Sequence, residues 1–222
     1  MNENLPTNED QSRVYRKEKV TNISLKVASA AIFSALSMVV SIFTTEILPR
    51  VQWGLALFDP VSIIWILAFF VFGYEVGLLT SIIGMLLLMP FDPWVPLGPL
   101  MKFAATIPLI IIPLIVNYMR KKSLKSKDAL KVTTLIINWV IAVVFRVIIM
   151  VVFNVIVINL MFGGDIFANA QTLAFIGLPG IDGWSAVIAT VIILNIIQSI
   201  WDYIIPYIIV KTIFYRKLNI PW

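Results

Sequence analysis

The polar residues best placed for chemistry lie in the last apolar segment of the chain. Asn195, Gln198, Ser199 and Asp202 are spaced i, i+3, i+4 and i+7. This spacing brings them onto one face of an α-helix, where two amides, a hydroxyl and a carboxylate can share hydrogen bonds. Their partner can be a bound solute or a neighbouring helix, because polar side chains also hold membrane helices together. Both interpretations stay open at this point.

Three further polar residues interrupt long apolar segments: Lys102, Arg146 and Asn154. A charge in the middle of a bilayer costs at least about 2.5–3.5 kcal/mol, so such a side chain normally faces a bundle interior or a wet cavity. Counting about 1.5 Å per residue places Arg146 and Asp202 at similar depth, and we predict a structural ion pair between them. The residues of these segments that we predict to contact a substrate are Lys102, Asn154, Asn195 and Gln198.

The residue types give little support to catalysis. The chain has no cysteine and no histidine, which removes the commonest nucleophile–base pairs and metal ligand sets. It also lacks a paired-carboxylate motif, a Gly-x-Ser-x-Gly motif and a Walker-type phosphate loop. We therefore predict a protein that is not an enzyme, that uses no cofactor and that binds no metal.

Composition defines the elements that must position these residues. Of 222 residues, 60% are hydrophobic and 13% are charged, whereas soluble domains are about 45–50% apolar and about 25% charged. Apolar runs near the bilayer-spanning length of about 20 residues recur, without the alternation of a membrane barrel. We predict an all-α integral membrane protein. The net charge of +5 is interpreted as membrane topology and not as nucleic-acid binding.

Six transmembrane helices in one bundle account for these runs. We place them at about residues 24–48, 60–73, 76–89, 100–119, 132–162 and 184–214, within a membrane domain of residues 23–218. Residues 1–22 form a polar, basic tail and residues 219–222 a short C-terminal tail. The Pro-rich stretch 90–99 is expected to lie outside regular helix, because proline removes backbone donors.

Basic residues segregate to one side of this topology. Fourteen of the 17 lysines and arginines lie in three groups: Arg13, Arg16, Lys17, Lys19 and Lys26, then Arg120, Lys121, Lys122, Lys125, Lys127 and Lys131, and finally Lys211, Arg216 and Lys217. With six spans all three groups fall on the same side, which the positive-inside rule makes cytoplasmic. We predict a multi-pass protein of the cell membrane with both termini in the cytoplasm.

The loops on the opposite side carry aromatic and acidic residues among prolines and glycines. Trp53, Asp59 and Trp94 are the members that we predict to contact the substrate, with the indoles stacking on a planar ring. Aromatic residues at this depth also serve as interfacial anchors, and that alternative stays open.

The first span has a different pattern, with many small residues in its inner half. Ala31 and Ala35 form a small-xxx-small pair that allows another helix to approach closely. The approaching helix belongs either to the same bundle or to a partner membrane subunit. We predict partner docking at these two alanines.

These features resemble the S components of energy-coupling-factor vitamin transporters, over about residues 24–218. The resemblance rests on the six spans, on the short hairpin formed by the second and third spans, and on the box Ala31-Ile32-Phe33-Ser34-Ala35. Among S components the riboflavin-specific members are the most similar. Leu57-Phe58-Asp59-Pro60 resembles their entry into the second helix. Leu194-Asn195-Ile196-Ile197-Gln198 resembles their Phe-Asn-x-x-Lys stretch, and Tyr215-Arg216-Lys217-Leu218 their basic end.

Two departures from that pattern concern the site. Gln198 stands where the pattern has lysine, and Gly98-Pro99-Leu100-Met101-Lys102 replaces a Gly-Glu-type entry into the fourth helix. The resemblance implies a substrate-binding subunit of a micronutrient importer, with riboflavin as the first-choice substrate. It also implies partners: a membrane coupling subunit, on which the alanine box docks, and two ATPase subunits.

Two other classes of protein stay open. One is a membrane scaffold or morphogenesis protein of similar helical layout, although a scaffold has no need of a polar stripe or a cavity. The other is an intramembrane enzyme such as a lipid transferase, which the missing nucleophile and base disfavour. A channel is disfavoured as well, because no filter sequence is visible.

Overall fold

The computed structural model describes residues 8–47, 58–119, 132–162 and 183–214, and all its regular elements are helical. In chain order they are α1 (Asn8–Ile47), α2 (Pro60–Phe72), α3 (Tyr74–Leu88), α4 (Leu97–Met119), α5 (Val132–Phe162), α6 (Gly183–Ile209) and a π-helical turn, η3 (Val210–Phe214). Four of the helices are long and apolar enough to cross a membrane, and α2 and α3 are shorter apolar helices. The all-α membrane class is confirmed.

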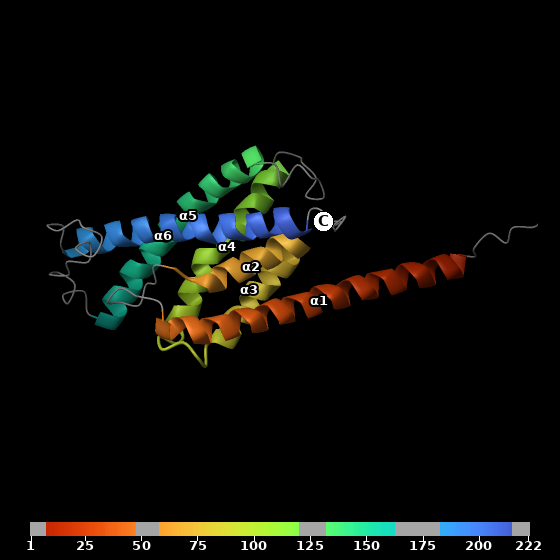
Figure 1. The fold of residues 1–222 in the computed structure, drawn as a ribbon, viewed down its shortest axis with the longest axis horizontal. Helices are drawn as coiled ribbons and strands as arrows, with labels where there is room; N and C mark the ends of the chain where they lie inside the picture. Colours follow the sequence, from red (N-terminus) through yellow and green to blue (C-terminus); the bar gives the residue numbers. More distant parts are fainter. Residues whose placement is uncertain (1–7, 48–57, 120–131, 163–182, 215–222) are drawn as a thin grey trace, which may run out of the picture.

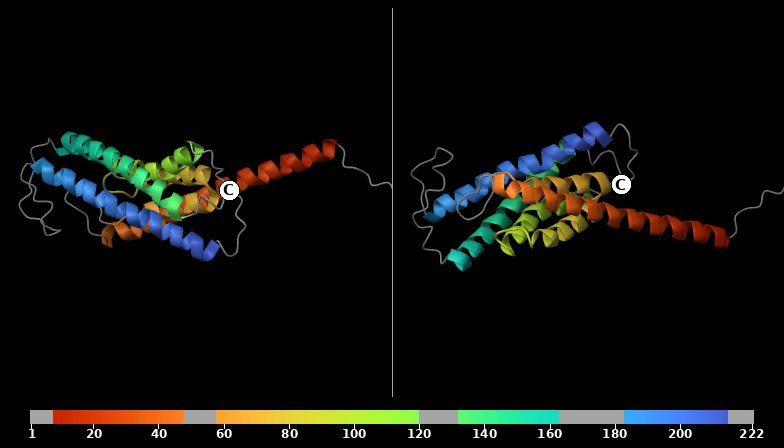
Figure 2. Two further views of the ribbon diagram at one scale, coloured as in Figure 1. Left: turned by 90° about the horizontal axis from the view of Figure 1, so that it is seen from above. Right: turned by 60° about the horizontal axis from the view of Figure 1, so that its bottom comes forward.

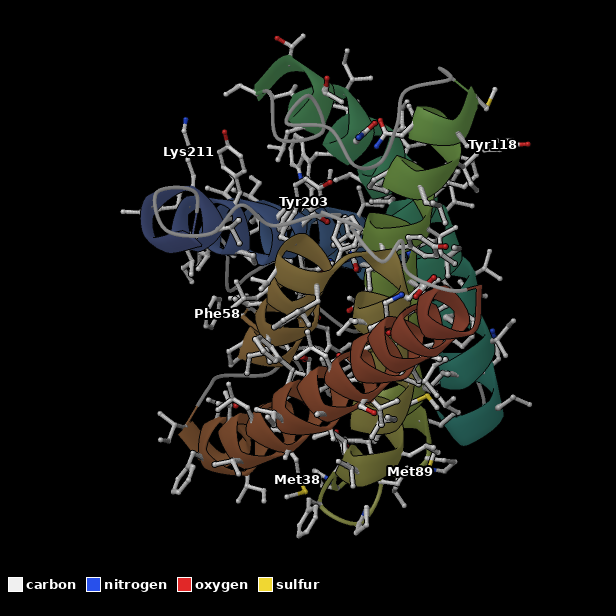
Figure 3. All side chains as sticks on the ribbon, turned by 90° about the vertical axis from the view of Figure 1, so that its right-hand side faces the viewer. Met38, Phe58, Met89, Tyr118, Tyr203 and Lys211 are labelled. Atoms are coloured by element: carbon white, nitrogen blue, oxygen red, sulfur yellow. The ribbon has the colours of Figure 1, made fainter. Side chains whose placement is uncertain are left out.

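Successive helices run in opposite directions across the bundle (Figure 1). The ends of α2, α4 and α6 therefore lie on one side, together with the starts of α3 and α5, as the turned views in Figure 2 also show. Helix α2 is the central element and packs against α1, α3, α4 and α6. Figure 3 shows the contrast between Tyr203, which lies inside the bundle, and Tyr118 and Lys211, which point away from it.

Local sequence explains the bounds of α2. The Asp59 side chain caps its start, because Asp59 Oδ1 accepts from Val61 N at 3.0 Å, and Pro60 fits a first helical turn. Gly73, with φ of 94°, ends the helix in a conformation that side chains disfavour. Gly77 then lets α3 return closely, since a Cβ there would meet the Cβ of Phe69 at 2.5 Å.

Serine side chains on α1 hold it against α2 and α3. Ser34 Oγ donates to Thr80 O at 3.0 Å, and Trp65 Nε1 donates to Ser37 Oγ at 3.0 Å. The Trp65 ring also lies over Gly84, where a Cβ would be 2.5 Å from Trp65 Nε1. The inward face of α1 is thus polar and small, and its hydrogen bonds are met within the bundle.

Two helix starts differ from the expected ones. Helix α1 begins at Asn8, so most of the polar segment before residue 24 is helical and belongs to the same helix as the first span. Helix α4 begins at Leu97 and includes Gly98 and Pro99, which were expected to lie outside regular helix. A proline in the first turn loses no intrahelical hydrogen bond, which is why Pro99 is accommodated there.

Candidate functional site

The first polar cluster surrounds the Lys102 ammonium at the start of α4. Lys102 Nζ lies 3.4 Å from Asp59 Oδ2 and 3.8 Å from Asp92 Oδ2, and it donates to Ser41 Oγ at 3.4 Å. These partners come from the end of α1, the cap of α2 and the connection between α3 and α4. One lysine therefore ties four segments together at one end of the bundle.

Asp92 was not among the predicted site residues, although its side chain is the most buried of the three charged ones in this cluster. Its Oδ1 accepts from Trp94 N at 2.9 Å, and its Oδ2 is buried without a hydrogen bond. Gly98 makes room for it, because a Cβ at that position would collide with Asp92 Oδ1. The sequence signal was the Asp-Pro turn followed by a glycine, which by itself does not say where the carboxylate points.

The charge balance of the cluster limits what it can bind. Two carboxylates face one ammonium, and the Lys102 side chain is only 13% exposed. Lys102 is therefore already neutralised by protein groups and cannot act as a free cation for an anionic solute. Uncharged or cationic groups fit this end of the bundle better than anions do.

The second polar cluster lies between α5 and α6 and is centred on Arg146. Arg146 Nη1 lies 2.5 Å from Asp202 Oδ2, so the two side chains predicted to pair are in contact. Arg146 Nε also donates to Asn195 Oδ1 at 3.1 Å, and Nη2 donates to Gln198 Oε1 at 2.9 Å. All four side chains are buried. A guanidinium with a fixed fork of donors is well suited to join three acceptors on one helix face.

This network occupies two of the amides that were predicted to contact substrate. Asn195 accepts from Arg146 and donates through Nδ2 to Val191 O at 2.8 Å, so both ends of its amide are engaged. Ser199, the remaining member of the stripe, donates to Asn195 O and accepts on its backbone oxygen from Trp139 Nε1. The arrangement joins α5 to α6, which is the helix-packing interpretation of the stripe.

Asn154 is in a different situation. It lies two turns beyond Arg146 on the same buried face of α5 and is 1% exposed. Its Nδ2 donates to Met150 O at 2.8 Å, whereas its Oδ1 is buried with no hydrogen-bond partner. A buried acceptor left unmet costs about 1–3 kcal/mol. Asn154 therefore offers an acceptor that a ligand can satisfy.

The surroundings of Asn154 are apolar. Met150 and Ile158, one turn to either side of it on α5, belong to a core cluster with residues of α4 and α6. That cluster consists of Ala105, Met150, Ile158, Val187 and Val191, with Met101, Ala104, Val151 and Trp184 packed against it. A single polar atom in such a setting is typical of sites that orient a largely apolar ligand.

The other predicted site residues are placed as follows. Trp94 is half-buried in the connection before α4, and Trp53 lies outside the described residues. Ala31 and Ala35 are exposed on the outer side of α1, opposite the serines that face the bundle. Within the described parts of the chain, no group of three His, Cys, Asp or Glu residues is arranged to hold a metal ion.

Helices long and apolar enough to cross a membrane, with polar clusters buried between them, place this chain among the helical-bundle membrane proteins. The chain belongs to the family of ECF transporter substrate-specific components, whose family model matches residues 25–214. A solved structure described as "Structure and mechanism of the S component of a bacterial ECF transporter" has a similar fold, with a TM-score of 0.54 and 19% sequence identity. That match covers 88% of this chain and 98% of the other. None of the curated proteins matches the sequence.

Family membership confirms the coarser part of the resemblance. The chain is a membrane-embedded transport subunit that binds a small molecule and works with a coupling module and its ATPases. Substrate-specific components are transport subunits and not enzymes, so the scaffold and lipid-transferase alternatives are set aside.

Proposed function

We propose that this substrate-specific component captures a vitamin, with riboflavin or a related flavin as substrate, from the outer side of the membrane. Three features support a flavin. The sequence around Asn195 resembles the riboflavin-specific members, and the Lys102 cluster favours an uncharged substrate over an anion. The unmet Asn154 acceptor lies among apolar residues, as a planar ring with an N–H edge requires.

The observation that carries this proposal is that Asn154 Oδ1 is buried without a hydrogen-bond partner. An imide N–H at the edge of a heterocycle can donate to Asn154 Oδ1, while the ring faces meet the methionines and tryptophan of the surrounding cluster. Asn195 and Gln198 then support substrate binding indirectly. Their hydrogen bonds with Arg146 hold α5 and α6 at the spacing that the ring needs. Trp94 and Trp53 are proposed as the aromatic residues that cover the ligand.

Asn154→Leu is the direct test of the site. We expect it to weaken riboflavin binding by about tenfold to a hundredfold, because a ligand donor loses its acceptor in an apolar environment. The thermal stability of the ligand-free protein should stay the same or rise, since an unmet buried acceptor has been removed. Both quantities are measured on purified protein, by quenching of flavin fluorescence and by thermal unfolding.

Asn159→Leu is the matched control, because Asn159 is an exposed asparagine on the same helix with the same bond from Nδ2 to the backbone oxygen four residues earlier. It should leave the affinity unchanged. Unchanged affinity in Asn154→Leu would remove Asn154 from the site. An absence of flavin binding in every form would remove riboflavin, while the role as a substrate-specific component would stand on the family.

We further propose that both termini and the connection between α4 and α5 are cytoplasmic, because a six-span topology would bring fourteen basic residues to one side. The chain has no cysteine, so single cysteines can be introduced without a background. Ser123→Cys should resist an impermeant thiol reagent in intact cells, and Asn169→Cys should react. The reverse labelling pattern would invert the topology.

A further inference from the structure

Helix α1 continues well past its membrane span. It is a single helix of 40 residues, whereas the apolar span within it is Ile23–Thr44. At about 1.5 Å per residue, residues 8–22 lengthen the helix by about 22 Å. Figures 1 and 2 show this part of α1 projecting alone beyond the ends of the other helices.

Charges are ordered along this extension. Glu9 and Asp10 lie at its far end, about 20 Å from the start of the apolar span at Ile23. Four basic residues lie between them and the span, at about 6 to 15 Å from Ile23, and Glu18 is the one acidic residue among them. We call these four residues the α1 basic band: Arg13, Arg16, Lys17 and Lys19.

The distances match the layer of lipid headgroups. That layer is about 5–8 Å thick on each side of a hydrocarbon core of about 30 Å, and electrostatic attraction extends about a further 8 Å at physiological salt. The basic band lies within this range, whereas Glu9 and Asp10 lie beyond it. We propose that the α1 basic band binds anionic phospholipid headgroups of the adjoining leaflet.

The next basic residue along the helix does not add to the band. Lys26, in the first turn of the span, forms an ion pair with Glu75 at the start of α3, so its charge is met within the protein. The band is also linked to the exposed alanines by continuous helix. Ala31 lies about 18 Å along the axis from Lys19. Headgroup binding at the band therefore sets the depth at which Ala31 and Ala35 are presented in the membrane.

Photo-crosslinking of the full chain in lipid nanodiscs tests this proposal. A phosphatidylglycerol analogue with a photoreactive headgroup is mixed into phosphatidylcholine, and adducts are located by mass spectrometry. We expect adducts on residues 8–22 that fall about tenfold or more in the variant R13Q/R16Q/K17Q/K19Q, and that also fall in high salt. The matched control K121Q/K122Q/K125Q/K127Q removes four basic residues between α4 and α5 and should leave the α1 adducts unchanged.

Three results would overturn the proposal. The first is an equal yield on residues 8–22 with a phosphatidylcholine analogue, which would show contact without charge selection. The second is an undiminished yield in R13Q/R16Q/K17Q/K19Q. The third is an absence of adducts together with weaker assembly of that variant with the coupling subunit, which would assign the band to an acidic protein surface. Helicity by circular dichroism verifies that the variant keeps α1.

Discussion

Arg146→Leu should lower the free energy of unfolding by about 3–5 kcal/mol, because it leaves the Asp202 carboxylate buried without its partner. It also removes the donors that meet Asn195 Oδ1 and Gln198 Oε1. Asp202→Leu should have a loss of similar size, since it strands the guanidinium. Unfolding of the purified protein by a denaturing detergent, in mixed micelles, measures both.

The double variant separates an ion pair from two independent effects. The double variant Arg146→Leu/Asp202→Leu should lose less free energy of unfolding than the two single variants lose together, because neither charge is left buried alone. Arg146→Lys keeps the charge and loses the planar fork of donors. It should therefore lower the free energy of unfolding, but by less than Arg146→Leu does. Strict additivity in the cycle would mean that the contact between Arg146 and Asp202 contributes nothing to stability.

Ala31→Trp/Ala35→Trp should abolish substrate uptake and leave the affinity of the isolated protein for its substrate within a few-fold. Both alanines are exposed on α1, and the hydrogen bonds that hold α1 in the bundle come from serines on its other face. Two indoles would therefore block the close approach of a partner helix without disturbing the interior. Uptake is measured in cells that carry the complete transporter, and affinity on the purified chain.

Val140→Trp/Val144→Trp is the matched control for this prediction. Val140 and Val144 have the same i, i+4 spacing and are 48% and 53% exposed on α5. Their replacement should leave uptake intact if docking is confined to α1. A collapse of substrate affinity in the alanine variant would instead show that Ala31 and Ala35 support the packing of the bundle.

The sequence predicted well how far along its helix each polar residue lies. Apolar runs of bilayer length define the helices, and a constant rise per residue then ranks each polar residue by depth. That is why Arg146 and Asp202, on different helices, could be matched before their contact was seen. The helical class and the family follow from the same features, because composition and span spacing are properties of the whole chain.

Helix rotation was decided only by the tertiary structure. A membrane helix is apolar toward lipid and toward its neighbours, so the usual contrast between a core face and a solvent face is weak. Alanines and serines share the same stretch of α1, and only packing places Ser34 and Ser37 toward the bundle and Ala31 and Ala35 away from it. In the same way, the rotation of α6 about its axis brings Asn195 and Gln198 into hydrogen bonds with Arg146. It leaves Asn154 Oδ1 without a hydrogen-bond partner.

The path of the connection between α3 and α4 was also determined only by the tertiary structure. Asp92 stands ten residues before Lys102 in the chain, and no periodicity relates a turn to a helix. Its carboxylate approaches Lys102 because the turn folds back over Gly98, where a side chain would collide with it. The sequence alone thus determined the class of protein, its family resemblance and the position of each polar residue along its helix. Folding determined which of those residues are already satisfied, since each hydrogen bond depends on two helix rotations and a loop path together.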